Sequence, residues 1–133
     1  MKVPPPFEPL PYFDQLGRRG ALRIHVVVPA KLIGVAETRD CTLIDISRTG
    51  ARIRLSHPVA VGSAAYLQIG QVQAFAIAVR VRTEEDGGIN GLAFDEPLSR
   101  QELLSVRDYA RNFEFEERRA AFLAARAWVT GGR

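Results

Sequence analysis

The chain has 133 residues, enough for one domain with its own hydrophobic core and too few for two domains of ordinary size. Hydrophobic residues make up 47% of it and charged residues 25%, as in a globular protein, and the single cysteine excludes an intramolecular disulfide. No apolar run reaches the roughly 18 residues of a membrane span, and the N-terminus has no apolar signal core, so we expect a cytoplasmic protein without membrane insertion. The net charge of +3 permits an anionic partner but lacks the dense basic blocks of many nucleic-acid-binding proteins.

Residues 1–15 form a segment that holds five of the eight prolines of the chain. This composition predicts an extended tail that is short of backbone hydrogen-bond donors. Three arginines follow within six positions, at Arg18, Arg19 and Arg23, among glycines that disfavour a helix. We therefore predict a basic, flexible arm that leads into the first strand.

Short segments of alternating or β-branched residues then predict six strands joined by short turns. The first is Ile24–Ile33, where Pro29 predicts a sheet edge or a bulge. The others are predicted at residues 40–46, 51–55, 65–69, 75–82 and 89–94. Phe75 belongs to the odd-numbered apolar set of its strand, which we expect to face the core. This run of short strands predicts an antiparallel sandwich or a small barrel.

The turn between the second and third strands carries polar residues at defined positions. Ser47 and Gly50 occupy the first and fourth places of a four-residue turn, where these residue types are favoured. Gly50 can accept a positive φ without steric cost, which suits a hairpin with a bulge at its exit. Asp45 and Ser47 stand two residues apart on a strand and are expected to point to the same side. A carboxylate and a hydroxyl presented together at a strand end predict a binding site.

Residues 99–129 predict a helix that follows the strands. Ser99 and Glu102 fit a capping box, and no proline or glycine interrupts the segment. One apolar stripe at helical spacing predicts packing of the first half on the barrel. Its members are Leu103, Val106, Ala110 and Phe113. Farther on, the apolar residues leave this stripe, so the helix either bends near Asn112 or meets a partner at its far end.

The sequence offers no recognisable catalytic or metal-binding motif. His25 and His57 are isolated and match no metal-ligand spacing, and Cys41 lies in an apolar strand, where a buried thiol is expected. Neither a G-x-S-x-G motif nor a phosphate-binding Walker loop is present. We therefore predict a protein that is not an enzyme and needs no metal and no cofactor.

Arginine, aspartate and serine together suit a ligand with guanines and phosphates. A guanidinium group chelates phosphate or the O6/N7 edge of guanine, and a carboxylate accepts hydrogen bonds from the guanine N1 and N2 protons. Arg52, Arg54, Arg80 and Arg82 share outward faces of their predicted strands and are expected to be solvated.

Two motifs in this order resemble the PilZ domain family. They are Arg19-x-x-x-Arg23 and Asp45-x-Ser47-x-x-Gly50, and residues 91–94, Gly-Leu-Ala-Phe, resemble the end of the family's last strand. The resemblance covers about residues 16–97 and implies a mainly β fold, a six-stranded antiparallel PilZ-type β-barrel with a C-terminal α-helix. The chain then divides into a proline-rich tail (1–15), the barrel with its basic arm (16–98) and the helix (99–129).

The resemblance also implies binding of the bacterial second messenger cyclic di-GMP. The implied binding residues are Arg18, Arg19, Arg23, Asp45, Ser47, Arg48 and Gly50. Arg19 and Arg23 would hold guanine and phosphate from the arm, while Asp45 and its turn would form the wall on the barrel side. A basic residue at Arg18 implies an intercalated pair of ligand molecules rather than one. Ordering of the arm by the ligand would relay the signal to an unidentified downstream protein.

Two alternatives stay open. A nucleic-acid-binding barrel would need exposed aromatic rings on adjacent strands. Tyr66 and Phe75 are the candidates, and because Phe75 is predicted to face the core, nucleic acid is the weaker prediction. A PilZ-like module without ligand would instead act by protein contact through residues 113–128.

Overall fold

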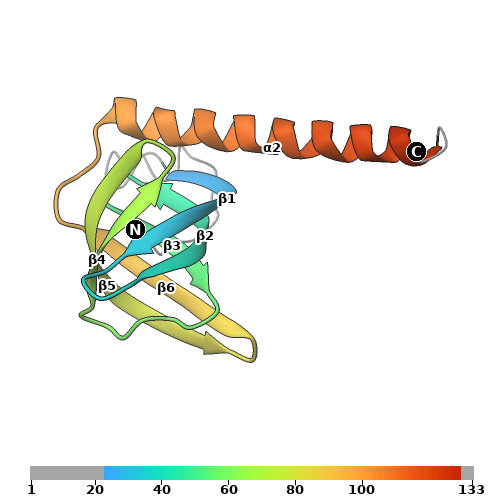
Figure 1. Ribbon diagram of the computed structural model, residues 1–133. Coiled ribbons are helices and arrows are strands. Elements are labelled where there is room, and N and C mark those ends of the chain that lie inside the picture. Colours follow the sequence, from blue (N-terminus) through green and yellow to red (C-terminus); the bar gives the residue numbers. More distant parts are fainter. Residues whose placement is uncertain (1–22, 130–133) are drawn as a thin grey trace, which may run out of the picture.

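The computed structural model describes residues 23–129, which form a closed barrel of six strands and one long helix (Figure 1). The elements are β1 (Arg23–Ile33), β2 (Thr38–Ser47), β3 (Gly50–Leu55), β4 (Ala64–Ile69), β5 (Val72–Glu84), β6 (Gly87–Phe94) and α2 (Arg100–Val129). The prediction of a six-stranded antiparallel barrel with a C-terminal helix is confirmed. The predicted proline-rich tail, Arg18 and Arg19 lie outside the described residues.

The strands follow the order β1-β2-β3-β6-β5-β4 around the barrel, and every neighbouring pair is antiparallel. β1 closes the barrel by pairing with β4, so β1 is not an edge strand. Pro29 itself pairs with Thr42, and the bulge that it predicted lies just before it, between His25 and Val28.

The predicted inward face of β5 is wrong. Phe75, Ile77, Val79 and Val81 point outward with 37–47% of their surface exposed, while Ala74, Ala76 and Ala78 are buried. A six-stranded barrel has a narrow interior, and the leucines and isoleucines of the other strands already fill much of it. Small alanines therefore fit inside, and the bulky residues turn outward. Because both faces of β5 are apolar, the sequence pattern does not fix which face is buried.

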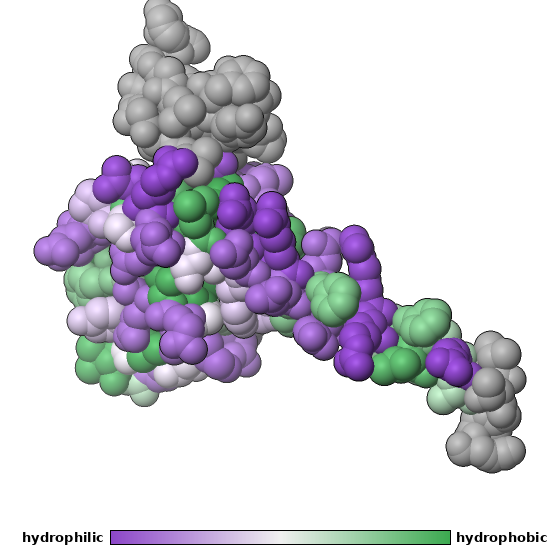
Figure 2. Space-filling model, turned by 90° about the horizontal axis from the view of Figure 1, so that it is seen from above, coloured by the Kyte–Doolittle hydropathy of each residue, from purple (hydrophilic) through white to green (hydrophobic). Residues whose placement is uncertain are grey.

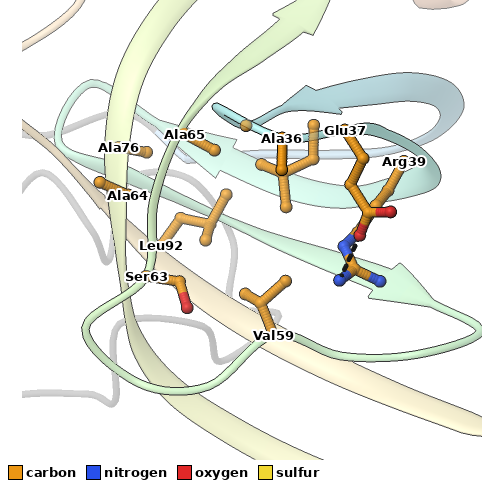
Figure 3. Close-up of a pocket in the computed structure, with 11 residues that line it drawn as sticks. Ala36, Glu37, Arg39, Val59, Ser63, Ala64, Ala65, Ala76 and Leu92 are labelled. Atoms are coloured by element: carbon orange, nitrogen blue, oxygen red, sulfur yellow. Dashed lines mark ion pairs between the residues drawn. The ribbon is translucent and has the colours of Figure 1, made fainter.

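A cavity of about 160 Å³ opens at one end of the barrel, between the β1–β2 turn and the β3–β4 connection (Figure 3). Its walls are mostly small or aliphatic, among them Leu32, Val59, Ala64, Ala65, Ala76 and Leu92. An ion pair joins Arg39 to Glu37 at 2.7 Å on its lining. The small residues of β4 and β5 thus leave space that larger side chains would fill.

Asn90 is a buried polar residue that the sequence did not single out. Its side-chain amide donates to the carbonyls of Val59 at 2.9 Å and Arg80 at 3.0 Å, and its oxygen accepts from the Val59 amide at 2.8 Å. These bonds satisfy the buried amide and hold the β3–β4 connection against β5 and β6.

The helix α2 begins with the predicted capping box. The Glu102 amide donates to Ser99 Oγ at 3.0 Å, and the Ser99 amide donates to Glu102 Oε1 at 2.8 Å. Leu103, Val106 and Ala110 are buried against the barrel, as expected. The helix also rests on the β4–β5 turn at Gly70, where a Cβ would come within 2.8 Å of the Tyr109 ring.

Beyond Phe113 the helix leaves the barrel and does not end or break near Asn112, where a bend was one of the two alternatives. It stays continuous to Val129, and its side chains from Glu114 to Trp128 are exposed. Figures 1 and 2 show this half extending from the barrel, with hydrophobic and hydrophilic side chains alternating along its upper surface. Within residues 23–129 no helix is long and apolar enough to cross a membrane.

Candidate ligand-binding site

The candidate site lies where β1, β2 and β3 run side by side, around the carboxylate of Asp45. The Asp45 side chain is 0% exposed, and both of its oxygens accept hydrogen bonds from arginines. Arg23 on β1 donates from Nη1 to Oδ1 at 2.9 Å, and Arg52 on β3 donates from Nη2 to Oδ2 at 2.9 Å. His25 Nδ1 lies 3.9 Å from Oδ2. A buried carboxylate is thus clamped between two guanidinium groups.

Two irregularities in strand pairing flank Asp45. The β1–β2 ladder shifts register between His25 and Val28. The β2–β3 ladder shifts between Leu43 and Asp45. A bulge redirects neighbouring side chains and is frequent beside functional sites. The resulting register pairs Asp45 with His25 on one side and with Arg52 on the other, which brings side chains of three strands together.

Burial governs the electrostatics of this cluster. Loss of hydration penalises the charged form, so burial raises the pKa of Asp45, while the charges of Arg23 and Arg52 oppose the rise. Burial likewise lowers the pKa of Arg23, and Asp45 opposes that change. An arginine loses its proton only far above neutral pH, so the Arg23 guanidinium stays charged despite this shift. Two positive groups and one negative group favour an anionic ligand at the rim.

Ser47 and Gly50 shape the turn that follows Asp45. The Ser47 hydroxyl is buried, accepts from the Thr49 amide at 3.3 Å and donates to the Gly50 carbonyl at 3.4 Å. Gly50 does not use the positive φ that a glycine can accept, because in residues 23–129 only Gly62, Gly70 and Gly87 have one. Gly50 is required for another reason: a Cβ there would lie 2.4 Å from the Leu92 carbonyl oxygen on β6. The predicted bulge also lies on the incoming strand β2, not at the hairpin exit.

Arg48 connects the same turn to the start of the helix. Its Nε donates to the Leu98 carbonyl at 2.6 Å, and its own carbonyl accepts from the Leu98 amide at 2.8 Å. Leu98 is buried and directly precedes the Ser99 cap of α2. The hairpin that carries Asp45 is therefore held at two points to the segment from which α2 begins.

The structure brings four of the predicted site residues together: Arg23, Asp45, Ser47 and Gly50. Arg48 instead contacts Leu98. Arg52, expected as a solvated residue, is a partner of Asp45 with a side chain only 23% exposed. The missed signal was its position, since residues 45 and 52 are placed symmetrically about the predicted turn and so face each other across the hairpin.

Other candidate chemistry is structural. Cys41 is buried as predicted, and burial raises the pKa of its thiol to about 12, which leaves it inert as a nucleophile. His25 is exposed, as predicted. In the part of the chain from residue 23 to 129, no group of three or more His, Cys, Asp or Glu side chains is placed to hold a metal ion.

The family model of the PilZ domain matches residues 17–112. The chain belongs to the PilZ domain family. The match confirms the resemblance to this family, and it extends past the barrel into the part of α2 that packs on it. No curated protein matches the sequence.

Solved structures share the PilZ fold of this chain. The PilZ domain of YcgR from Escherichia coli, determined with c-di-GMP, is 18% identical at a TM-score of 0.51, covering 78% of this chain and 97% of that one. The inhibitor of motility MotI/DgrA from Bacillus subtilis is 15% identical at a TM-score of 0.53, covering 76% of this chain and 53% of that one. The chain therefore spans about half the length of MotI/DgrA. At these identities the likeness establishes the fold.

Proposed function

We propose that this PilZ domain binds cyclic di-GMP at the rim of the barrel where β1, β2 and β3 meet. The observation that carries the proposal is the buried Asp45 carboxylate that holds Arg23 and Arg52 in fixed positions. Each phosphodiester of the ligand is an anion, and a positioned guanidinium can bind it through two donors. The c-di-GMP complex of the similar YcgR domain supports the same ligand class here.

Asp45 acts first as a positioning residue. Both of its oxygens accept from arginines and its side chain is buried, so it offers no exposed acceptor while these bonds are in place. When Arg23 turns toward a ligand phosphate, Oδ1 becomes available to the N1 and N2 protons of a guanine. Binding would thus exchange one internal ion pair for contacts with the ligand, at little loss of satisfied polar groups.

The remaining predicted contacts come from the arm and the turn. Arg18 and Arg19 lie five and four residues before Arg23 in the sequence and would close over the ligand from the arm. Ser47 and Gly50 keep the turn compact beside Asp45, and Arg48 would add a contact if it exchanged its bond to Leu98 for the ligand. Arg18 favours an intercalated pair of ligand molecules.

Relay to a downstream protein would follow from the connections of the site. Ligand contacts would order the arm at Arg23, and the segment just after it, at Ile24 and Val26, packs against the core that includes α2. The Arg48–Leu98 bonds join the ligand-binding turn to the start of the same helix. A ligand shifts such an arrangement only through its different affinity for the ordered and unordered arm.

Calorimetric titration with cyclic di-GMP, GTP and a short single-stranded oligonucleotide tests the proposal. Arg19→Ala should abolish saturable binding of cyclic di-GMP, as should Asp45→Ala. Because Asp45→Ala removes the carboxylate that pairs with two arginines, Asp45→Asn is measured beside it and folding is checked by circular dichroism. Arg54→Ala is the matched control, since Arg54 lies two residues from Arg52 on β3 and pairs with Glu84 at 2.6 Å, outside the site.

The outcomes separate the alternatives. A stoichiometry near two would support the intercalated pair. A folded protein that gives no heat with cyclic di-GMP would overturn the receptor proposal and favour a module that acts by protein contact. Heat with the oligonucleotide alone would favour nucleic-acid binding through Tyr66 and Phe75, which are both exposed on adjacent strands. Their rings already pack edge to face, with 5.1 Å between the ring centroids, which limits the surface left for stacking bases.

A further inference from the structure

One row of residues crosses the outer wall of the barrel at the level of Asp45. In the strand order β1, β2, β3, β6 and β5, the register pairs His25, Asp45, Arg52, Gly91 and Arg80 each with the next. The residues on either side of Arg52 in the chain are buried in the core, so Arg52 itself lies on the outer face. The candidate site uses the first three members of the row, and the row continues past it onto β6 and β5.

The three register shifts of the described barrel all lie beside this row. The shift in the β1–β2 ladder follows His25, the shift in the β2–β3 ladder precedes Asp45, and the shift in the β5–β6 ladder precedes Arg80. The backbone at Arg80 is also fixed from inside, because its carbonyl accepts from the buried Asn90 amide at 3.0 Å. Bulges re-aim side chains and are frequent beside functional sites, so the irregularity that accompanies Asp45 recurs at Arg80.

Gly91 leaves the middle of the row, between Arg52 and Arg80, without a side chain. Its φ is not positive, since in residues 23–129 only three other glycines have a positive φ, so the backbone there does not require glycine. Gly91 opens the Gly-Leu-Ala-Phe segment that the sequence analysis singled out. Gly91 is buried beneath its neighbours, so a ligand group reaches it when the long arginine side chains move apart.

The adjacent row of the same sheet shows the filled alternative. There Ile89 lies between Arg54 and Arg82, and it is only 7% exposed. Both arginines donate to Glu84, at 2.6 Å and 3.0 Å. A branched side chain therefore fits between two arginines on this wall, and the row of Gly91 differs by lacking one.

The spacing of this row suits a flat base. Neighbouring strands lie about 4.8 Å apart, so the Cα atoms of Arg52 and Arg80 are about 10 Å apart across Gly91. A base stacked between two guanidinium planes at van der Waals distance needs about 7 Å between the planes, which long side chains can adopt. Splayed-out bases are commonly recognised by stacking on guanidinium planes. Without a Cβ at position 91, the edge of such a base can approach the backbone.

We propose that the second guanine of cyclic di-GMP stacks between Arg52 and Arg80 above Gly91, which makes Arg80 a ligand-binding residue outside the two sequence motifs. This inference rests on the proposed function, in which the first guanine meets Asp45. Gly91 lies two strands from Asp45, about 10 Å away, and Arg52 stands between the two places. The two guanines and the phosphates that link them then meet an acceptor, a cation and a stacking pair along one line.

Calorimetric titration of Arg80 variants with cyclic di-GMP tests the contact. Arg80→Ala should weaken binding about tenfold, the scale of one lost stacking contact. Arg80→Lys should bind no better than Arg80→Ala, because lysine keeps the charge but lacks the plane. Arg82→Ala is the matched control and should bind like the wild type, since Arg82 lies two residues farther along β5 and pairs with Glu84.

The outcomes separate this inference from the proposed function. A wild type that does not bind cyclic di-GMP would overturn both. Binding that Arg19→Ala abolishes and Arg80→Ala leaves unchanged would overturn only the stacking of the second guanine. Full recovery of affinity in Arg80→Lys would show that position 80 supplies charge alone, which also overturns the stacking.

Two further measurements test the place of the base directly. Gly91→Val should weaken binding by a similar factor, since its side chain fills the gap, and urea denaturation checks that the variant stays folded. In the wild type, the Arg80 Nε–H resonance should shift through the ring current of the guanine when ligand is added, while that of Arg82 stays in place. The Arg80 resonance is assigned by its loss in Arg80→Lys. An Arg80 resonance that does not move at saturation would overturn the proposal.

Discussion

Polar side chains usually lie outside a protein and large apolar ones inside. The site end of the barrel and the far half of α2 depart from this placement in opposite ways. At the site, a carboxylate and two arginines are drawn into the protein and satisfied by one another. On the far half of α2, large apolar side chains such as Phe122 and Trp128 stand in solvent. Buried polar groups and exposed apolar patches are the departures that carry information about function. The difference is that the barrel end buries charged groups in pairs, whereas the far half of α2 leaves apolar side chains in solvent.

The largest expected effect is at the buried cluster. Asp45→Ala leaves Arg23 and Arg52 without the carboxylate that compensates them, and we expect a loss of about 3 kcal/mol in the free energy of unfolding. Urea denaturation followed by circular dichroism measures it. A stability equal to wild type would mean that the arginines reach solvent freely and that the site is not fixed by Asp45.

A smaller loss is expected at the turn beside the cluster. Gly50→Ala forces a Cβ to within 2.4 Å of the Leu92 carbonyl oxygen, so β3 and β6 must separate locally. We expect a loss of about 2 kcal/mol in unfolding free energy, together with weaker binding of cyclic di-GMP. Gly62→Ala is the control for a glycine substitution, since nothing lies within 4 Å of its Cβ, although its φ of 97° adds backbone strain. A Gly50→Ala protein as stable as the wild type would show that the approach to Leu92 is unimportant.

Substitutions in the barrel interior test how tightly its alanines are packed. Ala78→Leu overfills a position that is 1% exposed, and we expect a loss of about 2 kcal/mol in thermal or urea unfolding. Ala76→Val points toward the 160 Å³ cavity and should cost far less. If both substitutions cost the same, the cavity is not available to a larger side chain.

The smallest expected effect concerns an ion pair on the surface. Hydrogen bonds from Arg54 and Arg82 lower the pKa of Glu84, so its contribution to stability is present above its unfolded pKa and is lost as pH falls through the lower folded value. Because these groups are exposed, Glu84→Gln should change the urea midpoint only slightly, and added salt should remove the change. A large change in the urea midpoint that salt does not remove would show that this surface ion pair stabilises the fold as the buried Asp45 cluster does.

Features that depend on neighbouring residues were predicted correctly from the sequence. Features that depend on contacts between distant parts of the chain were not. The hairpin and the capping box were predictable because each depends on residues close in sequence. The strand pattern left a sandwich and a barrel open, and only the resemblance to the PilZ family selected the barrel. The role of Gly50 was not, since it depends on Leu92 more than forty positions away. The face of β5 was mistaken because both of its faces are apolar, and only the volume of the closed barrel selects the alanines for the interior.

The candidate site was predicted in part for the same reason. Asp45 and Ser47 belong to a local motif, whereas Arg52 lies on the returning strand, and its place opposite Asp45 follows from the register that the turn sets. Arg52 was expected among the solvated arginines because that register was not applied. Arg18 and Arg19 remain predictions. The straight course of α2 past Phe113 also required the structure, because a scattered apolar pattern fits both a bend and an unfilled surface.

The strand order has a consequence for folding kinetics. The site is built from β1, β2 and β3, which are consecutive in the chain and pair through short turns. Closure of the barrel instead needs β4 to reach β1 and β6 to insert between β3 and β5, contacts between segments far apart in sequence that form slowly. We therefore expect residues 23–52 to acquire native pairing early, so that the ligand-binding hairpin exists in the folding chain before the barrel that supports it has closed.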